Sequence, residues 1–235
     1  MNKRQKLVQE QFLNNEQEII KQLEKTYSKS LDDINEKIKN LTFTINDLKL
    51  EYSWLDDNDP EKARIKSMIQ SKIYQKQYQE QLHRQVDGIL QRMHVAEFTN
   101  ISDYLDTCYT DGYIGSFYDL HGQGVPIVAP IDQEAMVRAV QVESKINKGL
   151  YTRLGEDVTT LKARISAEVS RGISTGKTFA QVAKQIEGQS RIGYNKAIRI
   201  ARTEGHRIQT TATMDAMGVA KKKGATYYRV WTEIS

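Results

Sequence analysis

The residues best suited to chemistry lie close to the C-terminus. Helical spacing over residues 197–219 places an apolar stripe on one face, with Arg199 and Arg202 on the opposite face. Glu204 breaks this pattern, because it falls in the middle of the apolar stripe. A carboxylate that faces a core must be paired or it will bind a proton, and Arg207 is within reach three residues further on. The predicted chemistry is therefore electrostatic: an inward ion pair, and outward cations available to a polyanion.

Positive charge is concentrated around this stretch. The chain of 235 residues has a net charge of +4. Residues 190–229 contain nine lysines and arginines against two acids, which gives 9 − 2 = +7 for this segment alone. A basic patch of this kind is an electrostatic footprint for nucleic acid, and a solvated helix face looks the same. The candidate DNA-contact residues are Arg199, Lys221, Lys222 and Lys223.

Neither catalytic residues nor metal ligands emerge from the pattern. Cys108 has no histidine at a spacing that suggests pairing, so it is read as a small buried side chain. Residues 172–178 resemble a phosphate-binding loop, but three residues separate the two glycines where a Walker A motif needs four. Gly172 is better explained as a left-handed residue after a helix end. We therefore predict no enzyme, no cofactor and no metal site, and the histidines are scattered at His83, His94, His121 and His206.

The N-terminal half is predicted to consist of long helices. An apolar heptad stripe runs from Tyr27 to Leu55 with no glycine or proline inside it, which predicts a helix over about residues 5–55. Asp59 is placed as the N-cap of a second helix, with Pro60 at its first position. Two long helices joined by a short turn predict an antiparallel hairpin, a coiled-coil arm that suits contact with a partner.

Shorter elements are expected in the C-terminal half. A short amphipathic piece is expected over 101–109 and a loop over 121–124. The helices expected after them span 132–149 with Asp132 as N-cap, 156–171 with an apolar face, 178–186 closed by Gly188, and 197–218. Alternating residues over 226–231 predict a strand. The predicted fold class is mainly α: a long N-terminal antiparallel helical hairpin, then a compact helical domain with a short β segment at the C-terminus. The domain boundaries follow as 1–98 for the arm and 99–235 for the compact domain. No apolar run is long enough to span a membrane, and no secretory leader is recognisable.

The run from Ile200 through Ala201, Arg202 and Thr203 to Glu204, with Arg207 after it, resembles the hallmark of phage minor head proteins, the Mu F-like head morphogenesis family. The order of elements over residues 105–231 is similar too. In that family the chain continues past the strand into a polar segment, whereas this one stops at Ser235, so we expect a truncated form or a short variant. Arg202, Glu204 and Arg207 match the motif, and the resemblance implies that they form a structural ion pair.

The resemblance also implies a function. It indicates a minor capsid protein that acts in head assembly at the portal vertex, inside the virion head and in the host cytoplasm during assembly. It implies contact with the portal protein, with phage DNA without sequence specificity, and with other head proteins, but not with a membrane. One alternative is a non-catalytic protein–protein adaptor that does not bind DNA. A nuclease or transferase is the less favoured alternative.

Overall fold

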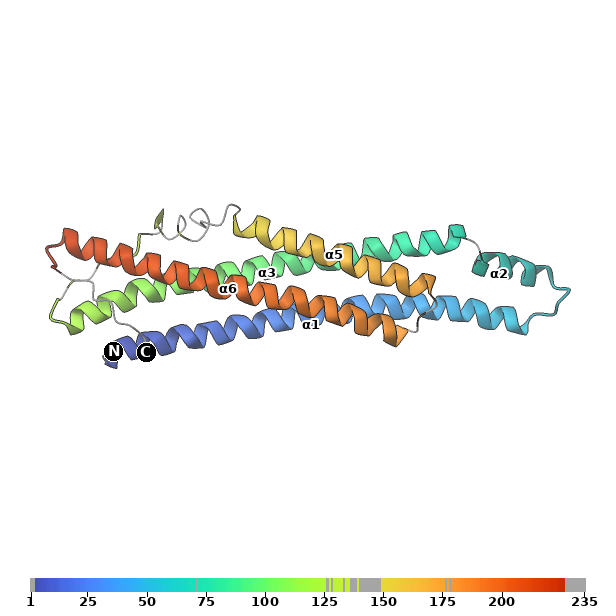
Figure 1. The fold of residues 1–235 in the computed structure, drawn as a ribbon, viewed down its shortest axis with the longest axis horizontal. Coiled ribbons are helices and arrows are strands. Elements are labelled where there is room, and N and C mark those ends of the chain that lie inside the picture. Colours follow the sequence, from blue (N-terminus) through green and yellow to red (C-terminus); the bar gives the residue numbers. More distant parts are fainter. Residues whose placement is uncertain are drawn as a thin grey trace. The chain divides into compact units, whose positions relative to one another are not determined.

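The computed structural model describes residues 3–70, 72–125, 127, 129–132, 134, 135, 139, 149–175, 177 and 179–226. The chain is mainly helical (Figure 1). The helices are α1 (Lys3–Trp54), α2 (Pro60–Gln70), α3 (Lys72–Gly122), α5 (Leu150–Ser174) and α6 (Phe179–Lys222). The mainly helical class is thus confirmed, and no strand occurs in the residues just given. The predicted β segment lies, apart from Thr226, outside them. None of the described helices is both long and apolar enough to cross a bilayer.

The chain divides into two compact units. Unit 1 comprises residues 1–22, 98–152 and 198–235, and unit 2 comprises 23–97 and 153–197. One division lies between residues 97 and 98, next to the predicted boundary between 98 and 99, and the chain is also divided after residues 22, 152 and 197. The first 22 residues group with the C-terminal half of the chain, and residues 153–197 group with the predicted arm. The reason is that α1, α3 and α6 each contribute one part to each unit.

The turn after α1 follows the predicted capping pattern. The backbone N–H of Glu61 donates a hydrogen bond to Asp59 Oδ1 at 2.8 Å, and Pro60 is the first residue of α2. This arrangement satisfies an amide that the first helical turn would leave unpaired. The Lys62 ammonium closes the turn by donating to the carbonyl of Leu55 at 2.6 Å. The sequence therefore predicted where α1 ends and where α2 begins.

Unit 1 is built on antiparallel segments of α1 and α3, with α6 packed against them. Arg4 donates to the carbonyl of Tyr118 at 2.8 Å, and Asn15 donates to Asp111 at 2.6 Å, so positions rise along α1 as they fall along α3. Tyr109 connects α3 to α6 by donating to Asp215 at 2.7 Å. The apolar core of the unit includes Phe12, Ile19, Ile101, Leu105, Ile208 and Ala212.

Unit 2 packs the remaining parts of α1 and α3 against α5 and the first half of α6. Along α5 the predicted apolar face is buried, since Val158, Leu161, Ile165 and Val169 all lie in the core. Lys162 of α5 forms an ion pair with Asp87 of α3 at 2.7 Å. Further core residues are Leu23, Ile34, Ile38, Val86, Leu90, Leu154, Val182 and Ile186.

Helix lengths are where the sequence prediction was wrong. The expected helix end at Gly188 does not exist, because α6 continues through this glycine to Lys222. Likewise α3 continues to Gly122, where a short helical piece and a loop were expected. Gly172 is not a left-handed residue after a helix end but lies inside α5, buried in tight contact with Val182. A glycine inside a helix costs about 1 kcal/mol relative to alanine, and burial of the neighbouring apolar residues exceeds that cost.

The segment between α3 and α5 is described only in part. The amides of Glu134 and Ala135 donate to Asp132 Oδ1 at 3.0 and 3.2 Å, so the predicted N-cap at Asp132 is confirmed. Most of the helix expected from there to residue 149 lies outside the described residues.

Candidate functional site

The part of α6 in unit 1 presents the predicted apolar face to the core. Ala201, Ile208 and Ala212 are buried there, whereas Arg199 and Arg202 are exposed. Glu204 lies within the buried face, with only 1% of its surface exposed. The sequence pattern therefore located both the inward and the outward side of this helix.

The buried carboxylate of Glu204 has a cation beside it. Arg207 Nε lies 2.7 Å from Glu204 Oε2, one helical turn further along α6. The same guanidinium uses Nη2 to donate to the carbonyl of Ala139 at 2.8 Å. Charge-assisted hydrogen bonds of this kind are stronger than neutral ones. Arg207 thus neutralises an acid of the core and fixes α6 to the segment that contains Ala139.

Arg202 does not join this ion pair. Its Nε donates to Glu16 Oε1 of α1 at 2.7 Å, so the predicted group of Arg202, Glu204 and Arg207 is divided into two pairs. The reason is geometric, because positions 202 and 204 point to nearly opposite sides of a helix. Sequence reasoning missed Glu16, which lies 186 residues away along the chain. No local spacing could have indicated it.

A close contact between α6 and α3 also escaped the sequence analysis. A Cβ added to Gly205 would lie 2.6 Å from the hydroxyl oxygen of Tyr104. A Cβ on Gly112 of α3 would lie 3.0 Å from the carbonyl oxygen of Gln209. A Cβ at Gly205 would require Tyr104 to shift, and one at Gly112 would require its neighbours to move by a few tenths of an ångström. The sequence feature that could have indicated this close contact was the glycine directly after Glu204, in the middle of an otherwise regular helix.

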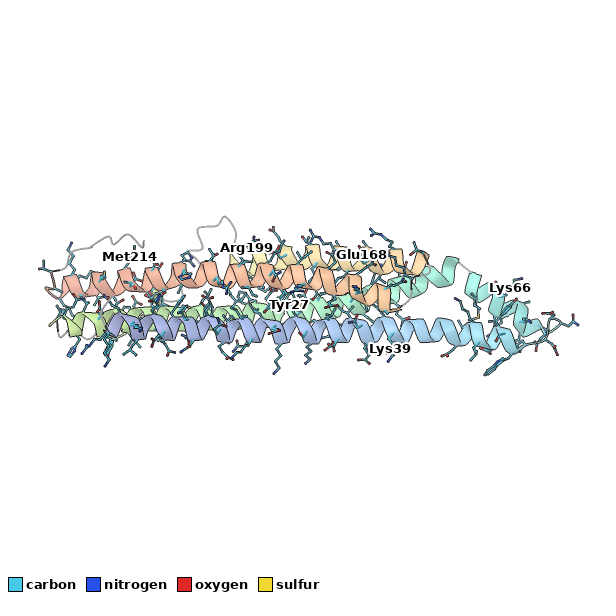
Figure 2. The ribbon with its side chains drawn as sticks, turned by 60° about the horizontal axis from the view of Figure 1, so that its bottom comes forward. Tyr27, Lys39, Lys66, Glu168, Arg199 and Met214 are labelled. Carbon is cyan, nitrogen blue, oxygen red and sulfur yellow. The ribbon has the colours of Figure 1, made fainter. Side chains whose placement is uncertain are left out.

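The candidate DNA-contact residues lie at two separate places on α6 (Figure 2 labels Arg199). Arg199 is exposed in the middle of the helix, and Lys221, Lys222 and Lys223 are exposed at its end. The 22 residues that separate Arg199 from Lys221 span about 33 Å of helix, at roughly 1.5 Å per residue. The structure therefore does not gather these four cations into one cluster.

The lysine run also has a structural explanation. Gly224 has a φ of 91°, and the amide of Ala225 donates to the carbonyl of Ala220 at 3.0 Å, which is the usual end of a helix. Lysines in the last turn interact favourably with the negative end of the helix dipole. The position of these lysines at a helix end therefore explains part of the basic charge without a bound ligand.

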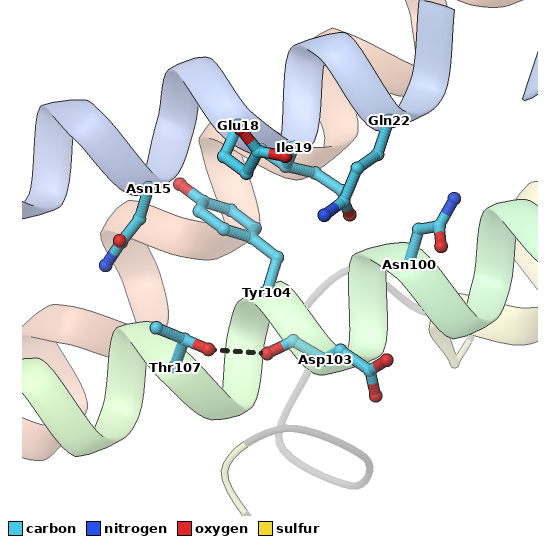
Figure 3. A pocket seen from close by; sticks show the side chains of 8 residues that line it. All are labelled: Asn15, Glu18, Ile19, Gln22, Asn100, Asp103, Tyr104 and Thr107. Atoms are coloured by element: carbon cyan, nitrogen blue, oxygen red, sulfur yellow. Dashed lines mark hydrogen bonds between the residues drawn. The ribbon is translucent and has the colours of Figure 1, made fainter. Parts of the chain in front are cut away.

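A groove of about 240 Å³ lies between α1 and α3 in unit 1 (Figure 3). Glu18 contributes a carboxylate from one wall and Asp103 from the other, and the side chain of Tyr104 extends from α3 toward α1. Two carboxylates disfavour a phosphate here, so a nucleic acid would have to bind elsewhere. The groove is lined by Asn15, Glu18, Ile19, Gln22, Asn100, Asp103, Tyr104 and Thr107.

The ionisable groups of unit 1 give little support to nucleophilic catalysis. Burial raises the pKa of the Cys108 thiol to about 12, so the thiolate needed for nucleophilic attack is scarce at neutral pH. Burial likewise raises the pKa of Tyr104. Among the side chains that the structure describes, no three histidines, cysteines or acids are grouped so that they could hold a metal ion.

Comparison with known proteins gives two distant relatives. The chain is 26% identical over 232 residues, 98% of its length, to the NAD(+)–arginine ADP-ribosyltransferase EFV of Enterococcus faecalis, of which it covers 44%. It is also 26% identical over 158 residues, 64% of its length, to the minor head protein GP7 of Bacillus phage SPP1, of which it covers 50%. The chain thus spans half or less of the length of these curated relatives. No protein-family model matches it, and no solved structure does.

Proposed function

We propose that this protein is a phage minor head protein that acts in head assembly at the portal vertex and becomes part of the virion. The observation that carries the proposal is the similarity to the minor head protein GP7 over 158 residues. Supporting it, the motif residues Glu204 and Arg207 form a buried ion pair, the structural role that the family resemblance implies. In this proposal the helices of residues 1–98 serve as an arm for contact with a partner, and the chain performs no catalysis.

DNA contact is the second part of the proposal. Arg199, Lys221, Lys222 and Lys223 are exposed cations, and exposed cations of this kind contact phosphates without reading sequence. Each phosphate contact contributes about 0.9 to the slope of log affinity against log salt concentration on duplex DNA.

A salt titration tests this part directly. Changing Lys221, Lys222 and Lys223 together to alanine should lower that slope by about 3, and weaken binding to unrelated sequences equally. The matched control changes three exposed lysines of α1, Lys21, Lys25 and Lys29, and should leave the slope nearly unchanged. Equal slopes for both triple variants, or no binding at low salt, would remove DNA from the proposal.

An adaptor that contacts protein but not DNA is the second candidate, and one observation favours it. A groove of about 210 Å³ between α1 and α3 in unit 1 has an apolar lining that includes Leu7, Ile114 and Tyr118. These side chains are 49%, 55% and 43% exposed. Apolar side chains gathered on a surface in this way commonly mark a protein contact site.

Copurification with the portal protein distinguishes the candidates. Changing Ile114 to glutamate puts a charge into the apolar groove, so it should reduce the amount of chain that copurifies with coexpressed portal rings. The control, Ile192→Glu, adds the same charge at another exposed isoleucine, in unit 2, and should copurify normally. Portal binding without DNA binding would favour the adaptor. If the wild-type chain binds neither portal nor heads, both candidates fail.

The similarity to an ADP-ribosyltransferase calls for a direct test of the non-catalytic proposal. More than half of that transferase has no counterpart in this chain, since the match covers 44% of it. We expect no transfer of labelled ADP-ribose from NAD to arginine-rich acceptor proteins. Transfer above the level of a heat-denatured sample would overturn this part of the proposal.

A further inference from the structure

We propose that Glu97, in the core of unit 2, is a buried proton-binding site, and that unit 2 loosens when the proton leaves. The inference is independent of the phage-head proposal. It rests on the position of one carboxyl group among α1, α3, α5 and α6 in this unit.

Glu97 is buried, and the contacts described for it include no cation. Only 2% of its surface is exposed, and its Oε1 accepts a hydrogen bond from the hydroxyl of Tyr27 at 2.9 Å. Its second oxygen, Oε2, is buried and has no hydrogen-bond partner among the residues that the structure describes. A carboxylate taken out of water with only one neutral donor is costly, whereas the neutral acid is much less so.

The charged and titratable groups around Glu97 come from α1, α3, α5 and α6. Tyr27 faces it from α1, and Asp157 of α5 acts on it as a nearby negative charge. Lys196 of α6 is held by Asp157 at 2.5 Å rather than by Glu97. His94 lies one turn earlier on α3, and burial lowers its pKa, which favours the neutral imidazole. The neighbouring acid opposes ionisation of Glu97, and the available cation is already engaged.

Burial is the largest influence on Glu97. Burial raises the pKa of this carboxyl group, the hydrogen bond from Tyr27 lowers it and the charge of Asp157 raises it, and together they bring the pKa to about 7. The helices pack closely around this site: a Cβ on Gly193 would lie 3.1 Å from the Tyr27 ring, and one on Gly155 would lie 3.3 Å from His94. When the proton leaves, the carboxylate that remains is stable in this site only if water enters and hydrates it.

The consequence is a core whose stability depends on pH. Because the folded-state pKa is raised above the unfolded value, the contribution of Glu97 to the stability of unit 2 is fully present below the unfolded pKa and is lost as the pH rises to about 7. Above that pH the ionised carboxylate favours conformations in which the helices separate enough to hydrate it. One proton is released in this transition.

The test is a carboxyl titration of the full chain by carbon NMR with selectively labelled glutamate. The folded wild-type protein should show one glutamate with a midpoint near 7 that is missing from Glu97→Gln. The matched control, Glu24→Gln, removes an exposed glutamate of α1 in the same unit and should retain the signal. If every glutamate of the folded wild-type protein titrates at ordinary values, or if the signal persists in Glu97→Gln, the proposal is overturned.

Two further variants exclude a merely structural role and keep the test decisive if Glu97→Gln does not fold. Tyr27→Phe removes the donor that stabilises the carboxylate, so the midpoint should rise. Asp157→Asn removes a negative charge and releases Lys196, so the midpoint should fall. Shifts in these opposite directions support the proposal, and an unmoved midpoint in both variants contradicts it.

Discussion

Replacing Arg207 with methionine should destabilise unit 1 by about 3–5 kcal/mol, the usual cost of removing one partner from a buried ion pair. The substitution keeps much of the side-chain volume but removes the guanidinium 2.7 Å from the Glu204 carboxylate. That carboxylate is almost fully buried, with 1% of the residue exposed, so water cannot easily replace the lost cation. The carbonyl of Ala139 loses its charged donor in the same step.

This cost can be measured by chemical and thermal unfolding. A change of 1 kcal/mol shifts the melting temperature by about 2–4 °C in a protein of this size, so Arg207→Met should lower it by roughly 6–20 °C. Because the chain has two compact units, circular dichroism should be combined with hydrogen exchange of peptides from residues 198–222. These peptides should exchange faster in the variant, since the loss is located there.

Two controls make the reasoning refutable. Arg202→Met breaks an ion pair whose arginine side chain is 51% exposed, so it should cost about 1 kcal/mol or less. The double variant Glu204→Met with Arg207→Met removes both charges and should recover most of the stability lost in Arg207→Met alone. If Arg207→Met costs no more than Arg202→Met, or if the double variant is as unstable as the single one, Glu204 is not a buried charge that depends on Arg207.

Two further predictions concern packing and pH. Gly205→Ala should destabilise unit 1 by about 1–3 kcal/mol, because the added Cβ would meet the Tyr104 hydroxyl oxygen at 2.6 Å. Gly218→Ala meets nothing within 4 Å and should instead stabilise α6 by up to about 1 kcal/mol; urea unfolding that gives both variants the same sign would contradict this. Between pH 4.5 and about 7, unit 2 should lose up to roughly 3 kcal/mol through the raised pKa of Glu97, and Glu97→Gln should abolish this loss. An equally steep pH dependence of urea unfolding in that variant would refute the assignment.

Local spacing explains what the sequence could predict. The heptad stripe of α1 places Tyr27, Ile34 and Ile38 on one face, and all three are buried. Glu204 and Arg207 lie three residues apart, so the geometry of a single helix brings them together. The cap at Asp59 likewise depends only on its immediate neighbours. Each of these predictions required only the period of a helix or the geometry of a turn. None of them required knowing which helices pack together.

The features that the sequence did not predict depend on tertiary contacts. Glu16 and Arg202 are separated by 186 residues, and Tyr27 and Glu97 by 70, so no pattern in one segment could pair them. Gly188 was read as a helix end because glycine is a weak helix former. Packing of the helix on both sides of it overrides that preference, as tertiary context often does.

The buried acids of the two units show why position in a helix pattern is not enough to assign a role. A carboxylate that faces a core has two physical outcomes: a cation neutralises it, or a proton does. Glu204 follows the first course, because Arg207 lies on the same helix within reach. Glu97 follows the second, because the hydroxyl of Tyr27 carries no charge and Asp157 engages Lys196. The helix period identifies such an acid, but only the packed neighbours decide whether it serves as a permanent charge in the core or as a group that exchanges a proton.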